Sequence, residues 1–249
     1  MVRLTLTHVS ARYGRRTIVD DVTTPTFHGG QVVALLGPNA AGKSTLFRRI
    51  LGLVQGQGEV AIEGSDAERP VAYMPQETGA KAVLSVYESV LLARMQGRSL
   101  KVQPEDLAQV DRALEELAIT SLGERDIGDL SGGQRQLVSA AQALVQEPEI
   151  LMLDEPTSAL DLNRQINLLT VLRRLADERG MLILVALHDL NHALRFTDCA
   201  MVIEQGRLIA CGATQEVITP ALLRQVYRVE ARIEPCSKGR PQLIVEEAV

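Results

Sequence analysis

The chain has 249 residues, which is room for one large domain or two small ones. Hydrophobic residues make up 46% and charged residues 23%, so a sizeable core can form, and the net charge of −5 argues against a broad nucleic-acid surface. The three cysteines lack Cys-x-x-Cys spacing, residues 1–10 lack a signal-peptide core, and the longest apolar run, 181–187, is too short to span a membrane.

The first part of the chain is dominated by strand patterns. Alternating or continuous apolar residues, bounded by turn residues, predict strands over 4–9, 18–22, 32–36, 59–62 and 70–76. A turn at 13–16 separates the first two, and Gly29 and Gly30 form a turn before the third. Helical spacing follows over 45–53.

Strand patterns stop between residues 77 and 130. Residues 86–92 and 106–117 have helical spacing with charges on one face, and a polar connection over 96–104 separates them. We therefore predict a helical insert in an α/β domain.

Alternating helices and strands return after the insert. Helices are predicted over 134–146, 162–179, 189–196 and 220–227, and strands over 150–153, 181–186, 200–204 and 207–210. Gln205 and Gly206 form a hairpin turn, and two tail segments, 230–234 and 242–245, are expected to pair. This alternation predicts a mostly parallel sheet with ligands at the carboxyl ends of its strands.

A phosphate-binding loop lies between the strand over 32–36 and the helix over 45–53. The loop reads Gly, four residues, Gly-Lys-Ser, and consists of Gly37, Pro38, Asn39, Ala40, Ala41, Gly42, Lys43, Ser44 and Thr45. Its backbone N–H groups and the start of the helix can cradle phosphate. Lys43 can reach the β- and γ-phosphates, and the Ser44 hydroxyl can ligate Mg²⁺.

Two carboxylates follow the buried strand over 150–153. Asp154 is placed at the strand end beside the phosphate loop, where an aspartate can hold Mg²⁺. Glu155 points differently and can deprotonate an attacking water. A helix cap ahead of Pro156 would explain Asp154 alone but explains the pair poorly.

A second anion-binding helix start occurs at Ser131, Gly132, Gly133 and Gln134. Ser131 can cap the helix and the glycines expose N–H groups, although such a turn taken alone is usually only a cap and a bend.

The order of these motifs resembles that of the nucleotide-binding subunit of ATP-binding-cassette (ABC) transporters. The resemblance covers essentially the whole chain and implies an α/β P-loop NTPase fold with a mostly parallel core sheet, an antiparallel N-terminal β subdomain and a helical insert subdomain. It implies one ABC ATPase domain over 1–249, divided into a RecA-like core over 1–76 and 131–229, a helical signature subdomain over 77–130 and a tail over 230–249.

The resemblance also implies roles for individual residues. Tyr13 would stack on adenine, although a lone tyrosine could equally serve surface packing. Gln76 would contact Mg²⁺ and water, although taken alone it could be an ordinary loop residue. His188 would touch the γ-phosphate, although a histidine at a strand end can have a structural role. The catalytic residues would be Glu155, His188, Gln76 and Lys43. The Mg²⁺ ligands would be Ser44, Gln76 and Asp154. The nucleotide contacts outside the phosphate loop would be Tyr13, Ser131, Gly132, Gly133, Gln134 and Asp161.

The family mechanism implies a second copy of the chain. Two subunits pair head to tail, each site joining the phosphate loop of one copy to the Ser131–Gln134 signature of the other, with ATP and Mg²⁺ between them. The implied partners are membrane permease subunits and, indirectly, a periplasmic or lipid-anchored substrate-binding protein, with no nucleic acid. The subunit would lie peripherally on the cytoplasmic face of the inner membrane.

Three runs favour one branch of the family. Residues 86–92, 187–191 and 219–227 resemble ATPases of importers for iron–siderophore complexes, haem and vitamin B12, most of all the iron–siderophore members. An exporter or amino-acid importer ATPase, a soluble ABC ATPase of DNA repair or translation, and a regulatory nucleotide-binding module without turnover remain alternatives.

Overall fold

The structure is a computed structural model that describes residues 1–76, 83–96 and 101–249. Its strands are β1 (Arg3–Thr7), β2 (Val9–Tyr13), β3 (Arg16–Val22), β4 (Phe27–His28), β5 (Val32–Leu36), β6 (Glu59–Glu63), β7 (Val71–Met74), β8 (Ile150–Asp154), β9 (Leu182–Ala186), β10 (Cys199–Glu204), β11 (Arg207–Ala213), β12 (Val229–Pro235) and β13 (Pro241–Ala248). Its helices are α1 (Lys43–Ile50), α2 (Val86–Met95), α3 (Pro104–Glu116), η1 (Thr120–Leu122), η2 (Ile127–Asp129), α4 (Gly132–Leu144), α5 (Leu162–Arg179), α6 (Leu190–Phe196), α7 (Thr214–Val217), α8 (Pro220–Leu222) and η3 (Leu223–Tyr227).

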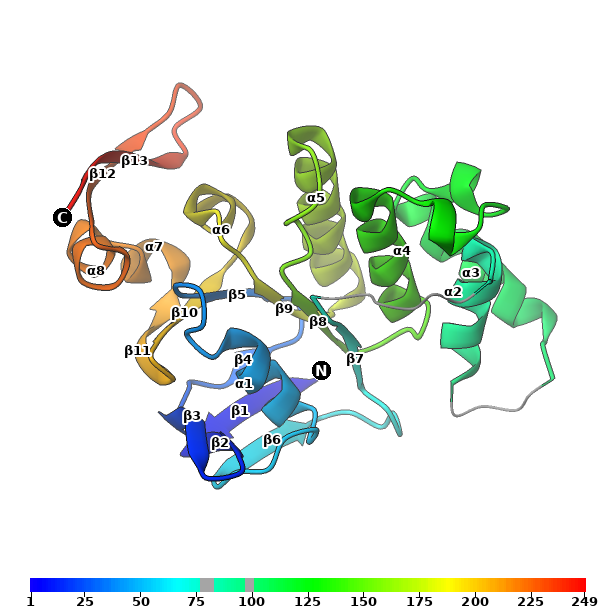
Figure 1. The fold of residues 1–249 in the computed structure, drawn as a ribbon, viewed down its shortest axis with the longest axis horizontal. Coiled ribbons are helices and arrows are strands. Elements are labelled where there is room, and N and C mark those ends of the chain that lie inside the picture. Colours follow the sequence, from blue (N-terminus) through cyan, green and yellow to red (C-terminus); the bar gives the residue numbers. More distant parts are fainter. Residues whose placement is uncertain (77–82, 97–100) are drawn as a thin grey trace.

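A mostly parallel sheet forms the centre of the fold (Figure 1), which confirms the predicted α/β class. In the described part of the chain its order is β11-β10-β5-β9-β8-β7, and only the edge pair β10–β11 is antiparallel. Strands β5, β8 and β9 are buried at every residue, because helices and further strands cover both faces of the sheet. The carboxyl ends of these parallel strands therefore meet at one edge.

The residues of β5 divide between two hydrophobic cores. Val32, Ala34 and Leu36 pack with the core that includes α2 to α6. Val33 and Leu35 pack with the core of α1 and the N-terminal strands. Figure 1 shows these two layers on opposite sides of the sheet.

The N-terminal strands form the expected antiparallel region, with one correction. β1 pairs with β4 and β6, and β2 pairs with β3. The prediction of one strand over 4–9 was wrong, because His8 has a φ of 51° and breaks the chain into β1 and β2. Sequence reasoning also missed β4.

The insert is helical over the described residues 83–96 and 101–130, as predicted; residues 77–82 and 97–100, which belong to the same prediction, lie outside the described residues. Ser85 and Glu88 form a capping box at the start of α2. Buried Arg94 donates to Asp106 of α3 (3.2 Å) and to Glu147 after α4 (2.7 Å), so one side chain joins the insert to the end of α4.

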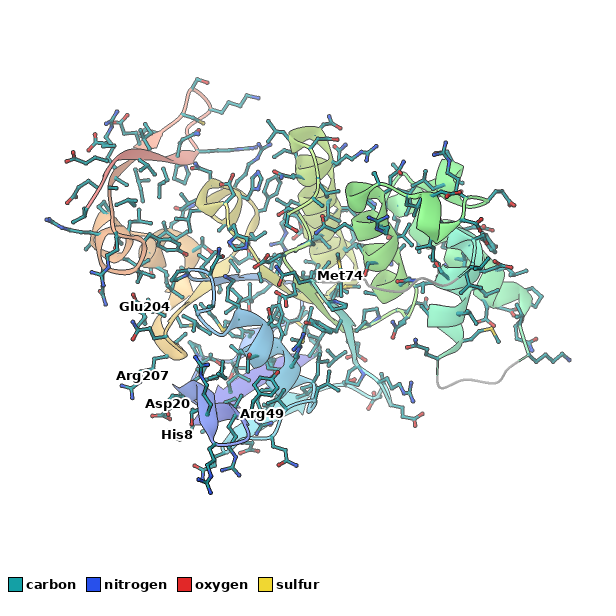
Figure 2. The ribbon with its side chains drawn as sticks, viewed as in Figure 1. His8, Asp20, Arg49, Met74, Glu204 and Arg207 are labelled. Atoms are coloured by element: carbon teal, nitrogen blue, oxygen red, sulfur yellow. The ribbon has the colours of Figure 1, made fainter. Side chains whose placement is uncertain are left out.

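The C-terminal half follows the predicted order. α5 has the predicted bounds, because Asp161 caps its first turn and Gly180, with a φ of 64°, ends it. The β10–β11 hairpin turns at Gln205 and Gly206, and Figure 2 shows Asp20 and Arg207, which pair at 2.8 Å, beside that turn. The predicted helix over 220–227 is confirmed in its bounds, and it consists of the short α8 followed by a π-helical turn, η3.

The two tail segments pair as β12 and β13, as predicted. The side chain of Asn191 docks this hairpin on α6 by accepting from the N–H of Leu243 (2.7 Å) and donating to its carbonyl (3.1 Å). Over the described residues, the structure contains no helix of the length and apolarity that a bilayer crossing requires.

Candidate nucleotide-binding site

The phosphate loop lies between the carboxyl end of β5 and the start of α1. Gly37 has a φ of 145°, and a Cβ built there would lie 2.1 Å from the carbonyl oxygen of Ile203, so a larger residue cannot take this position. α1 begins after Gly42 without a side-chain cap hydrogen bond. The first N–H groups of this helix are therefore available to an anion from outside the chain.

Lys43 points back into the loop. Its side chain is buried, and Nζ donates to the carbonyl oxygens of Gly37 (2.9 Å) and Pro38 (3.3 Å). Burial lowers the pKa of Lys43, while the nearby carboxylates of Glu155 and Asp154 act in the opposite direction. An ammonium held by weak carbonyl partners in a dry loop is suited to exchange them for phosphate oxygens.

Asp154 ends β8 at the bottom of the same region. It is 1% exposed and accepts from the hydroxyl of Tyr73 (3.2 Å) through Oδ2. Its Oδ1 is buried without a hydrogen-bond partner among the described residues. Burial raises the pKa of Asp154, against the effects of the Ser44 and Tyr73 hydroxyls, and burial also raises the pKa of Tyr73 to about 12.

These oxygen donors fit a small hard cation. A buried carboxylate with a free oxygen, next to a serine hydroxyl, is the donor set that Mg²⁺ uses when phosphates supply other ligands. Within residues 1–76, 83–96 and 101–249 no group of three or more His, Cys, Asp or Glu side chains is placed to hold a metal alone.

Glu155 is held between two residues that sequence analysis had paired with it. Gln76 follows β7 and donates through Nε2 to Glu155 Oε2 at 2.6 Å. His188 follows β9, and its Nε2 lies 2.6 Å from Glu155 Oε1. The ends of three adjacent parallel strands thus place an amide, a carboxylate and an imidazole in contact.

A cavity of about 680 Å³ opens in front of these groups. It is lined by Arg16, Ile18, Asn39, Ala40, Ala41, Gly42, Lys43, Ser44, Thr45, Gln76, Glu155 and His188. Sequence analysis missed Arg16 and Ile18, which carry no motif and reach the cavity only because β3 folds beside the loop. Tyr13 is not among the lining residues; it is 47% exposed at the end of β2, and its hydroxyl accepts from Arg48 at 3.4 Å.

The second helix start lies outside this cavity. Ser131 caps α4 and forms a capping box with Gln134, each side chain accepting from the other's backbone N–H (3.3 and 2.9 Å). Asp161 lies at the end of the loop that follows Glu155. It caps α5 by accepting from the N–H of Arg164 (2.9 Å). The structure thus does not bring Ser131, Gly132, Gly133, Gln134 or Asp161 to the phosphate loop of the same chain.

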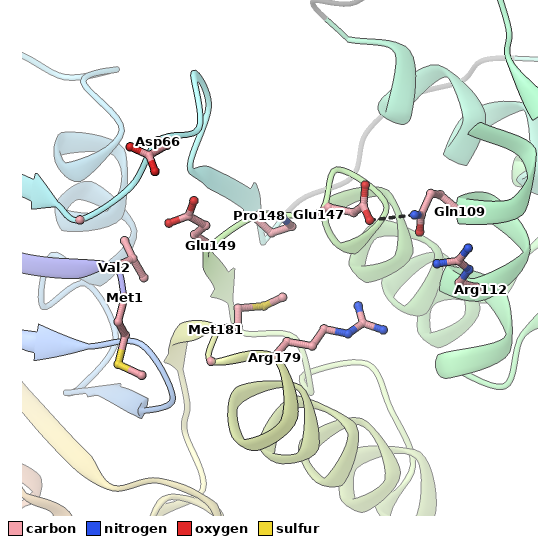
Figure 3. A pocket seen from close by; sticks show the side chains of 12 residues that line it. Met1, Val2, Asp66, Gln109, Arg112, Glu147, Pro148, Glu149, Arg179 and Met181 are labelled. Atoms are coloured by element: carbon pink, nitrogen blue, oxygen red, sulfur yellow. Dashed lines mark hydrogen bonds between the residues drawn. The ribbon is translucent and has the colours of Figure 1, made fainter. Parts of the chain in front are cut away.

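Another cavity, of about 580 Å³, lies at the opposite edge of the central sheet (Figure 3). Glu149 and Met181, which line it, precede β8 and β9, whereas Glu155 and His188 follow them. Figure 3 shows Asp66 and Glu149 on one side of this space and Arg112 and Arg179 on the other. It has no phosphate loop and no sequence-predicted site residue.

Comparisons with known proteins were made for the whole chain. The family profile described as ABC transporter matches residues 21–158. The iron(3+)-hydroxamate import ATP-binding protein FhuC of Bacillus subtilis is 38% identical over 232 residues, which cover 89% of this chain and 86% of that protein.

Solved structures of ABC transporters are also similar to this chain. The inward-facing structure of a putative metal-chelate type ABC transporter has a TM-score of 0.87 at 25% identity, covering 99% of this chain and 98% of the other. The dimeric post-hydrolysis state of an ATP-binding cassette with ADP and Pi has a TM-score of 0.76 at 25% identity, covering 85% and 98%. The likeness therefore extends over nearly the full length of the chain.

Proposed function

Because this chain belongs to the ABC transporter family, we propose that it is the ATP-hydrolysing subunit of an importer that takes up an iron–siderophore-type complex. The observation that carries the proposal is the contact of Glu155 with both Gln76 and His188, next to the phosphate loop. An ATPase needs a base within reach of the phosphate to be attacked, and these three residues line the cavity that the loop closes on one side.

ATP binds with its phosphates in the loop over 37–45. The uncapped start of α1 and the Lys43 ammonium meet the β- and γ-phosphates. The adenine end of the nucleotide extends towards β3 and Tyr13, whose exposed ring is free to stack on a base.

Glu155 acts as the general base. In the nucleotide-free chain both of its oxygens are in contact with Gln76 and His188, so the carboxylate is already aimed at the cavity. An attacking water replaces one of these contacts and is oriented by Gln76. It gives a proton to Glu155 while its oxygen bonds to the γ-phosphorus, and the bond from the γ-phosphorus to the β–γ bridging oxygen breaks, which releases ADP and phosphate. His188 donates a hydrogen bond to the γ-phosphate during this step.

Mg²⁺ would be held by Ser44, Gln76 and Asp154. When bound, it neutralises the phosphate charge that grows during transfer. Asp154 is prepared for this role because the Tyr73 hydroxyl fixes one carboxylate oxygen while the other has no partner among the described residues.

A second copy of the chain completes each site. Ser131, Gly132, Gly133 and Gln134 carry a helix start that is remote from the phosphate loop of its own chain, and Ser131 and Gly132 are exposed. In a head-to-tail pair they contact the nucleotide of the other copy, with Asp161 and its loop at the shared interface. The dimeric cassette among the similar structures supports this arrangement.

The remaining partners are membrane proteins. Two permease subunits bind the nucleotide-binding pair at the cytoplasmic face of the inner membrane, and a periplasmic or lipid-anchored binding protein delivers the substrate to them. The similarity to a hydroxamate-import ATP-binding protein favours an iron–siderophore cargo, with haem or vitamin B12 as the alternatives. Co-purification of a polytopic permease from detergent extracts tests this part, and purification with ribosomes or DNA instead would contradict it.

The ATPase assignment is tested with Glu155→Gln. The amide cannot accept a proton, so phosphate release should fall by roughly 10²- to 10⁴-fold while ATP-dependent pairing is retained. Glu149→Gln is the matched control: Glu149 precedes the same strand, lines the opposite cavity, and should leave the rate within about twofold. Hydrolysis at the parental rate in Glu155→Gln would contradict the role of Glu155.

A further inference from the structure

Two glutamines hold the loop that connects β8 to α5. Gln165, in the first turns of α5, donates to the carbonyls of Thr157 (3.1 Å) and Leu160 (3.0 Å). Gln136, in the signature helix α4, holds the same loop from the other side. Both residues are glutamines that donate hydrogen bonds to this loop, and they differ in the helix that carries them.

Every polar atom of the Gln136 amide is used by this loop. Nε2 donates to the carbonyl of Glu155 (2.7 Å) and to the hydroxyl of Ser158 (3.0 Å), and Oε1 accepts from the N–H of Ala159 (2.9 Å). Gln136 is 6% exposed, so water cannot readily replace these partners. A buried amide with both donors and its acceptor satisfied fixes the atoms it contacts.

The backbone that Gln136 fixes is a strained one. Glu155 has a φ of 53°, in the left-handed region that residues with a Cβ rarely adopt. This turn sends its side chain to Gln76 and His188 and its carbonyl to Gln136. The orientation of the Glu155 carboxylate therefore depends on a peptide unit that α4 holds in place.

The first turn of α4 packs directly on the same loop. A Cβ built on Gly133 would lie 2.7 Å from the carbonyl oxygen of Ala159 and 3.3 Å from the side chain of Leu160. Any other residue at this position would push the helix and the loop apart. The helix that carries Ser131 and the turn that carries Glu155 thus behave as one unit.

We propose that Gln136 is a positioning residue for ATP hydrolysis, which holds Glu155 in its left-handed turn and ties it to the helix that presents Ser131. This inference rests on the proposed function. In the head-to-tail pair, Ser131 contacts the nucleotide of the other copy while Glu155 serves the nucleotide of its own. The Gln136 amide is then a direct mechanical link between the two ATP sites of the dimer.

The first test compares Gln136→Glu with Gln165→Glu. Each change keeps the side-chain length, removes the amide donors that hold this loop, and leaves an acceptor in their place. Gln136→Glu should lower kcat about tenfold or more with the KM for ATP within about twofold, because the nucleotide contacts are intact. Gln165→Glu should leave kcat within about twofold at a temperature where both variants are folded. Equal losses of kcat in the two variants, or a loss in KM alone for Gln136→Glu, would overturn the proposal.

A second variant covers the case in which a buried carboxylate prevents folding. Gln136→Met keeps the bulk without charge, and it is combined with Glu155→Gln in a double-mutant cycle. Gln136→Met should slow the parent about tenfold yet leave the residual rate of Glu155→Gln unchanged, since a positioning residue has no effect once its target is lost. A further tenfold loss in the double variant would show that Gln136 acts elsewhere, which contradicts the proposal. Parental hydrolysis by Glu155→Gln itself would instead refute the proposed base, a different and recognisable outcome.

Discussion

Two helix starts in this chain contain glycine and have opposite local structures. α1 follows the phosphate loop, has Gly42 before its first turn and has no side-chain cap. α4 follows Ser131, whose capping box with Gln134 satisfies backbone donors within the chain. Neither first turn contains an acidic residue, so the positive end of each helix dipole is left to a ligand or to solvent.

The difference distinguishes a helix start that has other site residues beside it within one chain from a helix start that lies outside the cavity those residues line. α1 opens into a cavity that also contains Lys43, Glu155 and His188, so it forms most of a site within one chain. α4 carries exposed Ser131 and Gly132 away from that cavity, and the basic side chain of its first turn, Arg135, donates to the carbonyl of Leu130. This difference is the basis of the paired arrangement proposed above, in which the start of α4 contributes to the site of another copy.

The largest effect is expected from Lys43→Ala. It removes the only lysine of the phosphate loop, whose Nζ now contacts Gly37 and Pro38. Loss of a charge-assisted contact of this kind costs about 1.5–3 kcal/mol, or roughly 10- to 100-fold in ATP affinity, and ATP-dependent pairing should disappear. Equilibrium binding of ATP and sedimentation measure the two effects. Normal ATP-induced dimers in this variant would contradict a shared site.

Ser131→Ala is expected to have a smaller effect, which falls on pairing and not on ATP binding to the single subunit. Loss of the cap destabilises α4 by about 1 kcal/mol, and loss of the hydroxyl weakens ATP-dependent pairing by roughly tenfold. ATP binding to the single subunit should stay within about twofold, because Ser131 lies outside the cavity. A matched loss of ATP affinity in the monomer would remove the distinction between the two helix starts. Ser85→Ala, which removes the capping box of α2 outside the proposed interface, controls for the effect of cap loss on stability.

The smallest effect concerns stability. Burial raises the pKa of Asp154 above its unfolded value, so the charged carboxylate destabilises the nucleotide-free fold. This cost is absent below the unfolded pKa, appears as the pH rises through the folded pKa, and is fully present above it. Asp154→Asn should therefore raise the Tm of the nucleotide-free protein at neutral pH and leave it unchanged in acid.

The same variant should lose the gain in Tm that Mg²⁺ with ATP gives the parent, since a ligand stabilises only the state that binds it. Thermal unfolding with and without Mg²⁺ and ATP measures both results. A lower Tm for the nucleotide-free variant at neutral pH would show that the hydrogen bond from Tyr73 to Asp154 outweighs the burial of its charge.

The sequence predicted those parts of the fold and site that depend on local patterns. The bounds of α5 were read correctly because Asp161 and Gly180 cap it, and the strands β5, β8 and β9 because they are unbroken apolar runs. Residues at the ends of such strands, Gln76, Glu155 and His188, converge because neighbouring parallel strands end at one edge.

The rest depended on tertiary contacts that leave no local signal. His8, whose φ is positive, splits one alternating run into two strands, and the neighbouring residues do not predict this break. Gln136 looks like any polar helix residue, and its contacts with Glu155 and Ala159 exist only after α4 packs on the loop. Arg16 and Ile18 reach the cavity through the pairing of β2 and β3.

A mixing experiment tests the shared site most directly. Lys43→Ala and Ser131→Ala are each placed in the Glu155→Gln background, so that ATP is bound and not consumed. A pair formed from one copy of each contains one site with an intact phosphate loop and an intact signature, whereas neither variant alone can form such a site. With ATP, sedimentation should show dimers in the mixture and markedly fewer in either variant alone. A mixture that sediments as the average of the two separate samples would contradict the claim that one chain completes the ATP site of another.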